Sequence, residues 1–169
     1  MKKITRNFLE INSISDLISV GKPKQNIHIK LLNQTDFQLS KFLYKQIGKK
    51  YFWFDRLIWT DKEWIKYISN PSLYTYVLYV ENEVAGYFEI FHHKNRNEIE
   101  LTYLGLLEEY IQKKLGGYLL SEALKISWSY NVQRVWVHTC SLDHPNAIKN
   151  YLARGMKVFK NEVIFRNIA

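Results

Sequence analysis

Residues 101–129 restrict the possible folds of this chain more than any other stretch of the sequence. It begins with the apolar run LTYLGLL, passes through the basic, glycine-bearing turn EYIQKKLGG and continues into a helix-forming segment that reaches about Ser129. Apolar residues recur at helical spacing in that segment, at Leu115, Leu119, Leu120, Ala123, Leu124 and Ile126. A second strand is predicted at 133–139. A strand, a helix and another strand predict a crossover within one sheet.

The segments before this crossover predict strands and helices in a mixed order. Strands are expected at 4–11 and 26–32, with a short helical turn at 13–19 between them. Two helices follow, at 35–47 and at 61–69, and the second begins with a capping box formed by Thr60 and Glu63. A hairpin of strands is then expected at 74–80 and 84–91. Residues 92–97, HHKNRN, read as a polar turn before a long strand at 98–106.

After the crossover, the sequence predicts one more helix and one more strand. Pro145 suits the first helical position, and Gly155 suits the position just after the helix end. The last strand is expected at 158–165. This order indicates the α/β (α+β) class, with a sheet layered by helices.

Length and composition indicate one domain over residues 1–169, with residues 1–24 as an N-terminal extension whose structure the pattern leaves open. The chain has 169 residues and 47% hydrophobic content, enough for a core. A formal charge of +8 favours anionic partners such as nucleic acid, acidic membranes or phosphorylated small molecules. Cys140 is the single cysteine, so no internal disulfide forms and a structural metal site is not expected. With no signal peptide or membrane span predicted, a cytoplasmic location without membrane partners is expected.

The turn before the helix at 115–129 has the properties of an anion site. Backbone N–H groups at a helix N-terminus are unpaired and lie at the positive end of the helix dipole. Gln112, Lys113 and Lys114 add donors and charge at the same place. A glycine pair that opens a helix is more often simple chain punctuation, so the turn alone does not identify a ligand.

The turn and the segment after it together resemble the GNAT superfamily of acyl-CoA-dependent N-acyltransferases. The matching residues are Leu106, Glu109, Tyr110, Lys113, Lys114, Leu115, Gly116, Leu119 and Leu120, followed by Asn146, Ala147, Tyr151, Arg154, Gly155 and Met156. The resemblance implies a mixed, mostly antiparallel sheet with helices on both faces and a splayed pair of central strands. It also implies transfer of an acetyl group from acetyl-CoA to a primary amine on a small molecule or a protein, by a monomer or a homodimer.

The same resemblance gives roles to particular residues. The turn that wraps the coenzyme A pyrophosphate corresponds to Gln112, Lys113, Lys114, Leu115, Gly116 and Gly117. The strand end that binds the pantetheine corresponds to Leu104, Leu106 and Leu107. Asn146 corresponds to a contact with the pantetheine or the phosphate arm, and Tyr151 to the residue beside the thioester sulfur. The turn departs from the family pattern at Ile111 and Lys114, where the family has Arg or Gln and glycine.

Acetyl transfer needs a general acid and a general base, and the sequence offers candidates for both. Tyr151, with an ordinary pKa of about 10, is the expected acid that protonates the leaving thiolate. Glu100 is the first candidate for the base and His138 the second, although His138 fits a core histidine at least as well. Cys140 is expected to be a structural thiol and not a nucleophile.

An acceptor site is predicted in the aromatic segment 49–64. Its candidate residues are Trp53, Phe54 and Trp59, and a role for these rings in plugging the core is equally consistent with the sequence. Two other functions stay open. One is a non-catalytic acyl-CoA-binding domain that acts as a sensor or partner. The other, less favoured because no basic run with interleaved aromatics is concentrated enough, is nucleic-acid binding.

Overall fold

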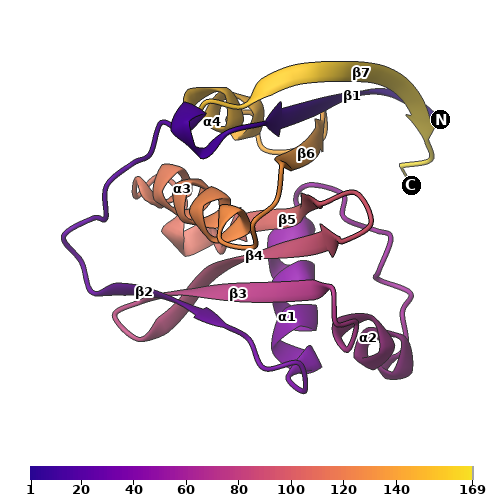
Figure 1. Cartoon of the computed structure of the whole chain (residues 1–169). Helices are drawn as coiled ribbons and strands as arrows, with labels where there is room; N and C mark the ends of the chain where they lie inside the picture. The colour runs from indigo at the N-terminus through magenta and orange to yellow at the C-terminus, as the bar shows by residue number, and fades with distance from the viewer. Residues whose placement is uncertain (169) are drawn as a thin grey trace.

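A seven-stranded sheet organises the part of the chain that the computed structural model describes, residues 1–168. The strands are β1 (Lys2–Ile11), β2 (Ile27–Leu31), β3 (Leu73–Val80), β4 (Glu83–His93), β5 (Glu98–Leu106), β6 (Arg134–Cys140) and β7 (Lys157–Arg166). Their order across the sheet is β2-β3-β4-β5-β6-β1-β7 (Figure 1). Neighbours are antiparallel except β5 and β6, which are parallel because α3 connects them by a crossover. The predicted mixed, mostly antiparallel sheet is confirmed.

Four α-helices and two short 3₁₀ turns complete the described chain: α1 (Phe37–Gly48), α2 (Asp61–Ile68), α3 (Leu115–Trp128), α4 (Ala147–Ala153), η1 (Ile14–Asp16) and η2 (Glu108–Tyr110). The predicted capping box of α2 is present, since Thr60 and Glu63 bond each other's backbone N–H groups. Gly155 follows α4 with φ of +99°, which favours glycine. The placement of Pro145 was wrong. The helix begins two residues later, with Asn146 as its N-cap, so Pro145 lies in the preceding loop.

Helices cover both faces of the sheet, and strand alternation separates their two cores. Leu78 of β3 packs with the α3 side chains, whereas its neighbour Val77 packs with Leu43 and Ile47 of α1. Successive residues of a strand point to opposite faces, so each of these helices buries one face of the same strands. No helix within residues 1–168 is both long and apolar enough to span a membrane.

The N-terminal segment is built into the fold. β1 lies between β6 and β7 and pairs with both, with Arg6 opposite Cys140 on one side and Glu162 on the other. After η1, the chain is bonded to the helices: the Ile18 N–H donates to the Arg154 carbonyl, and the Val20 N–H donates to the Ser121 hydroxyl. The sequence predicted the strand but did not predict that two sheet neighbours enclose it.

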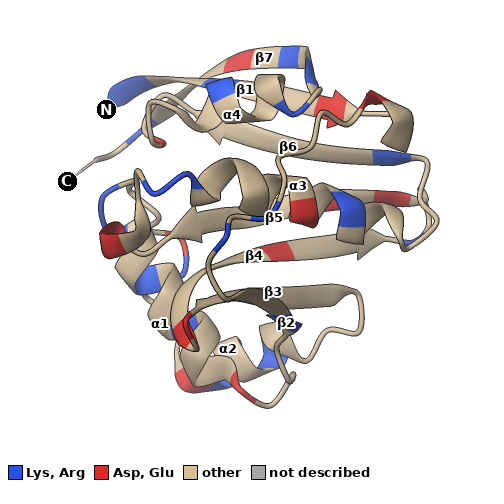
Figure 2. Ribbon diagram, turned by 90° about the vertical axis from the view of Figure 1, so that its left-hand side faces the viewer, with Lys and Arg blue, Asp and Glu red and all other residues tan. Residues whose placement is uncertain are grey.

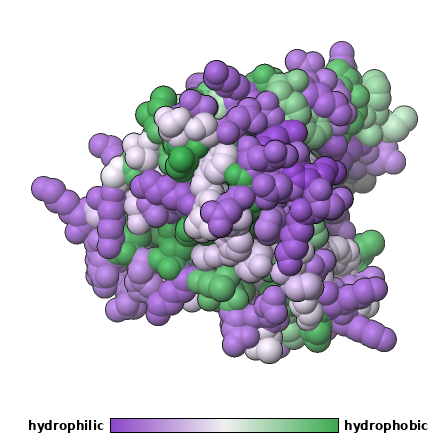
Figure 3. All heavy atoms as spheres, in the orientation of Figure 1, coloured by the Kyte–Doolittle hydropathy of each residue, from purple (hydrophilic) through white to green (hydrophobic). Residues whose placement is uncertain are grey.

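β7 forms one edge of the sheet and carries exposed apolar side chains: Val158, Phe159, Val163 and Phe165. Figure 3 shows hydrophobic atoms at the upper right of the molecule, over this strand. Unpaired strand edges with apolar side chains are places where a second chain can add. Whether the protein is a monomer or a homodimer stays a prediction.

The central pair of strands, β5 and β6, separates after a short contact. Their pairing covers Glu98, Ile99 and Glu100 of β5 against Arg134, Val135 and Trp136 of β6. From Leu101 onward β5 remains paired with β4 but no longer with β6. The predicted splay is therefore confirmed, and it leaves backbone groups of β5 and β6 facing a gap.

Candidate active site

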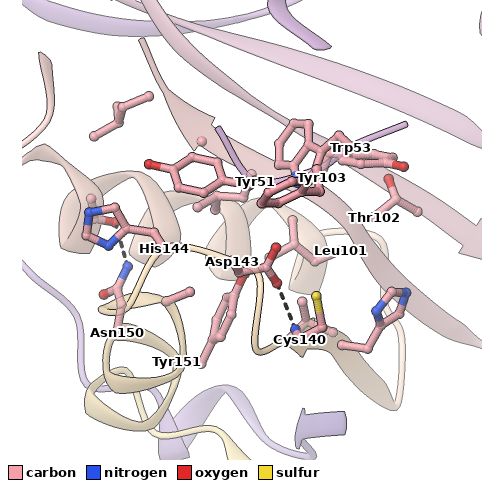
Figure 4. A pocket seen from close by; sticks show the side chains of 18 of the residues that line it. Tyr51, Trp53, Leu101, Thr102, Tyr103, Cys140, Asp143, His144, Asn150 and Tyr151 are labelled. Carbon is pink, nitrogen blue, oxygen red and sulfur yellow. Dashed lines mark hydrogen bonds between the residues drawn. The ribbon is translucent and has the colours of Figure 1, made fainter. Parts of the chain in front are cut away.

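A cavity of about 730 Å³ occupies the gap between β5 and β6. It is lined by the separated strand ends, by α4, by the turn before α3 and by the aromatic segment after α1. In Figure 4, Tyr151 and Asp143 point into it from one side, with Tyr51 and Trp53 on the other. The predicted strand residues Leu104 and Leu106 line it as well. Leu107 lies outside the lining, and its N–H donates to the Ala85 carbonyl.

The turn before α3 reaches one end of the cavity through Gln112, Lys114, Leu115 and Gly116. Figure 2 shows its lysines leading into α3. No side chain of residues 1–168 caps the α3 N-terminus, so the first N–H groups of this 14-residue helix remain free for an anion. Gln112 and Lys114 have φ of 66° and 59°, the left-handed conformation that favours glycine. Thus Lys114, at a position where the family pattern has glycine, adopts a backbone conformation that favours glycine.

Two residues predicted for this turn face elsewhere. The Lys113 ammonium lies 5.6 Å from the centre of the Tyr110 ring. Gly117 faces α4, because a Cβ atom there would lie 2.4 Å from a guanidinium nitrogen of Arg154. Gly116 has more room, since its nearest neighbour would be the Asn150 amide at 3.8 Å.

Helix α4 contributes Asn146, Asn150 and Tyr151 to the cavity lining. Asn146 is exposed at the helix start. The Asn150 amide donates to the Gly116 carbonyl at 3.1 Å and so fixes α4 against the start of α3. Sequence reasoning missed Asn150, although its position four residues after Asn146 puts both on the same helix face.

Tyr151 is the buried member of this group, with 8% of its surface exposed. Burial raises its pKa, and the negative charge of Asp143 raises it further. Asp143 is itself held in place, because one of its oxygens accepts from the Thr139 hydroxyl at 2.6 Å and the Cys140 N–H at 2.8 Å. The Tyr151 hydroxyl therefore stays protonated at neutral pH and is able to donate a hydrogen bond.

Both predicted bases line the cavity on strands adjacent to the gap. Glu100 bonds Nε2 of His93 at 3.0 Å. His138 is exposed to the cavity, so the alternative of a core histidine was wrong. Desolvation by the cavity walls lowers the pKa of His138, as does the charge of Arg6, so its imidazole is neutral at pH 7. The polar turn predicted at residues 92–97 was also misplaced, because β4 extends through His93.

Part of the aromatic segment lines the cavity, and the rest packs outside it. Tyr51 and Trp53 line the cavity, and the Tyr51 ring lies 5.9 Å from the ring of His144. Phe54 lies outside the lining and packs against Phe52. Trp59 also lies outside the lining, and its ring packs against Trp64 and Tyr67. Of the three predicted acceptor residues, the structure places one, Trp53, at the cavity.

A buried ion pair beside the cavity was missed by sequence reasoning. Arg56 is 6% exposed and bonds both oxygens of Glu89, which is fully buried, at 3.0 and 2.9 Å. Tyr67 and Thr102 donate to the same carboxylate. Five aromatic rings surround the guanidinium at 4.0 to 5.7 Å, those of Tyr44, Trp59, Trp64, Tyr67 and Tyr103.

This ion pair keeps its charges despite burial. Burial alone would lower the pKa of Arg56, but the charge and hydrogen bonds of Glu89 outweigh that effect and raise it. Arg56 also lines the cavity and lies three residues after Trp53. The pair therefore anchors the aromatic segment to β4 behind the cavity wall. Within residues 1–168, no group of three or more His, Cys, Asp or Glu side chains is placed to hold a metal.

The sequence of residues 37–156 matches the acetyltransferase (GNAT) family. The chain belongs to the GNAT family. The match covers the segment from α1 to Met156 and so includes the turn before α3, the strand gap and α4. No curated protein matches the chain by sequence.

Solved structures share this GNAT fold at low sequence identity. A GCN5-related N-acetyltransferase from Sphaerobacter thermophilus has a TM-score of 0.72 and 12% identity over 95% of this chain and 50% of that one. The aminoglycoside acetyltransferase meta-AAC0020, from an uncultured soil metagenomic sample, has a TM-score of 0.67 and 14% identity over 85% and 96%. A functionally unknown conserved protein from Staphylococcus epidermidis has a TM-score of 0.65 and 16% identity, and 96% of this chain spans 60% of its length.

GNAT proteins as a family use acetyl-CoA, and the cavity has features that fit this co-substrate. The uncapped α3 N-terminus suits a phosphate group, and the separated strands offer unpaired backbone groups to an amide-bearing arm. Both features border the same cavity as Tyr151.

Proposed function

We propose that this GNAT domain transfers an acetyl group from acetyl-CoA to a primary amine by direct attack. The observation that carries the proposal is the position of Tyr151, a buried and protonated phenol in the gap where β5 and β6 separate. The amine nitrogen forms a bond to the acetyl carbon and the carbon–sulfur bond breaks. The amine loses a proton to a base, and the thiolate takes a proton from Tyr151. The products are an N-acetylated amine and free coenzyme A.

The residues that would hold acetyl-CoA follow the cavity from end to end. The α3 N-terminus with Lys114 would bind the pyrophosphate, and the β5 backbone at Leu104 and Leu106 would bind the pantetheine. Asn146, exposed at the start of α4, would contact the same arm. Backbone N–H groups near Leu106 would polarise the thioester carbonyl.

Glu100 is the proposed base, acting through water, and His138 is the second candidate. Glu100 has a carboxylate oxygen besides the one that bonds His93, and this oxygen can accept a proton or a hydrogen bond. His138 is neutral at pH 7 and is also able to accept one. A cytoplasmic location stays a prediction from composition.

Replacing Cys140 with serine is expected to leave turnover within about threefold of wild type. Burial raises the pKa of the Cys140 thiol, and the charge of Asp143 raises it further, so this thiol is a poor nucleophile at neutral pH. Turnover would be measured as release of free coenzyme A thiol in the presence of an amine. Trapping of an acetyl group on Cys140 in the wild-type protein, with loss of turnover in Cys140→Ser, would contradict direct transfer.

Replacing Lys114 with glycine is expected to preserve or tighten acetyl-CoA binding. A non-glycine residue in the left-handed conformation carries a cost of about 1 kcal/mol or more, and glycine removes it. Calorimetric titration of both proteins with acetyl-CoA measures the effect, and Lys113→Gly serves as the matched control, because Lys113 lies outside the cavity lining. A tenfold or greater loss of affinity in Lys114→Gly alone would show that the Lys114 ammonium holds phosphate.

A non-catalytic acyl-CoA-binding domain is the second candidate function. It is favoured by the departure of the phosphate turn from the family pattern at Ile111 and Lys114. One experiment distinguishes the enzyme from the non-catalytic domain. An enzyme binds acetyl-CoA and releases thiol when amines are added, whereas a sensor binds it and releases none.

A further inference from the structure

Two arginines from strands outside the GNAT signature line the cavity, Arg6 on β1 and Arg166 on β7. The register places Arg6 opposite Cys140 of β6 and Glu162 of β7. Since alternate residues of a strand share one face, Arg6 and Arg166 lie on the sheet face that also presents His138 and Cys140. Both charges act on His138, because Arg6 and Arg166 each lower its pKa. The two arginines therefore lie on the same sheet face as His138, the second candidate base.

These arginines have unused hydrogen-bond donors. Arg6 donates from Nη1 to Glu162 at 3.1 Å, but its Nε is buried and has no hydrogen-bond partner among residues 1–168. Arg166 donates from Nη2 to the exposed Asp55 at 3.3 and 3.4 Å, both near the upper limit for such bonds. A guanidinium has five N–H donors in a fork that matches a carboxylate. Because the bonds between Arg166 and Asp55 are long, a carboxylate that binds Arg166 more tightly would replace Asp55.

Three carboxylates line the cavity: Asp55, which bonds Arg166, Glu100 on β5 and Asp143 in the loop before α4. Glu100, on β5, bonds His93 through one oxygen, and Asp143 is engaged by Thr139 and the Cys140 backbone. Glu100 and Asp143 each keep one oxygen that accepts no hydrogen bond among residues 1–168, and Glu100 is the proposed base, whereas two positive groups lie on β1 and β7. A cavity with separated charges of both signs complements a small molecule that has an ammonium and a carboxylate group.

We propose that the acceptor is a small amine that also carries a carboxylate, as a free amino acid does, with the carboxylate bound by Arg6 and Arg166 and the amino group directed to Glu100. This inference rests on the proposed acetyl transfer and adds the class of acceptor to it. It differs from the aminoglycoside acceptor that the name of the structural neighbour meta-AAC0020 gives for that protein.

Matched pairs of amines with and without a carboxylate test this proposal. Suitable pairs are alanine and ethylamine, lysine and 1,5-diaminopentane, and tryptophan and tryptamine, each supplied with acetyl-CoA and followed by thiol release. Phosphoethanolamine and ethanolamine form a further pair that distinguishes a carboxylate from a phosphate. In at least one carboxylate pair, the amino acid is expected to have a kcat/KM about tenfold or more above its partner.

The variants Arg6→Gln and Arg166→Gln test whether these two side chains cause the preference for an amine with a carboxylate. Each is expected to lower kcat/KM for the preferred amino acid about tenfold, mainly through KM, and to lower the value for the amine without a carboxylate by a clearly smaller factor. Arg96→Gln is the matched control, because Arg96 is exposed and lies outside the cavity lining. Arg166→Gln keeps the test valid if Arg6→Gln, which also breaks the Glu162 bond, does not fold.

The outcomes separate this inference from the function on which it rests. Thiol release with amines of every pair, without preference for the carboxylate, overturns the acceptor class and leaves acetyl transfer in place. Preference for phosphoethanolamine over every amino acid overturns the carboxylate. Acetyl-CoA binding with no thiol release for any amine overturns both proposals.

Discussion

Replacing Tyr151 with phenylalanine is expected to reduce kcat for amine acetylation about 10²-fold or more while the affinity for acetyl-CoA changes little. The substitution removes the hydroxyl that would protonate the departing thiolate and keeps the ring that packs in the core. Because the group acts in the transition state, kcat and kcat/KM should fall together. Steady-state thiol release and calorimetric titration with acetyl-CoA measure the two effects.

Tyr118→Phe is the matched control for this prediction. Tyr118 of α3 is as buried as Tyr151, each with 8% of its surface exposed, and it also belongs to the main core, but it lies outside the cavity lining. Its loss of hydroxyl should leave turnover near that of wild type. Equal turnover in Tyr151→Phe and wild type would remove the acid role from Tyr151.

Replacing Glu89 with glutamine is expected to lower the free energy of unfolding by about 3–5 kcal/mol. The change keeps the side-chain shape but leaves the Arg56 guanidinium buried without its counter-charge. Denaturant unfolding followed by tryptophan fluorescence measures it. Turnover should fall as well, since the pair anchors the segment that carries Tyr51 and Trp53 to the cavity.

A comparison with an exposed pair and with a double variant tests this explanation. Lys41→Met, which breaks the exposed pair with Asp61, is expected to cost at most about 1 kcal/mol. The double variant Arg56→Met with Glu89→Leu should be more stable than the sum of its single changes, since no unpaired charge remains. A loss below about 1 kcal/mol in Glu89→Gln would contradict the assignment of a tight buried pair.

The order and type of most elements could be predicted because each has a local signal. The capping box at Thr60 and the glycine after α4 mark helix ends by chemistry that acts over three or four residues. The position of β1 between β6 and β7 had no such signal. Pairing of the first and last strands depends on contacts between residues about 150 positions apart, which a local pattern does not encode.

The site residues that belong to a recognisable sequence motif were predicted. The site residues whose role depends on burial in the folded protein were missed. Tyr151 and the turn before α3 follow from the GNAT resemblance, and the structure places both at one cavity. Arg56 and Glu89 are 33 residues apart in the sequence, and each looks like a surface charge. Their burial is nevertheless indicated by the sequence around them. In WFDRLIW and in YFEIF, the charged residues lie between aromatic and aliphatic residues.

Lys114 departs from the family pattern, and its backbone conformation in the structure shows that the departure has an energetic cost. The family pattern has glycine at this position, and glycine lets the backbone approach a phosphate closely. In the structure Lys114 takes the left-handed conformation that glycine favours, which carries an energetic cost for a residue with a side chain. The side chain then adds a positive charge beside the α3 N-terminus.

Calorimetric titration of the wild-type protein with acetyl-CoA, followed by thiol release on addition of amines, tests the central claim most directly. We predict saturable binding at one site per chain and release of coenzyme A that depends on an amine. Binding without release would make the protein an acyl-CoA-binding domain. Absence of binding would contradict the assignment of the cavity between β5 and β6 and every role proposed for its residues.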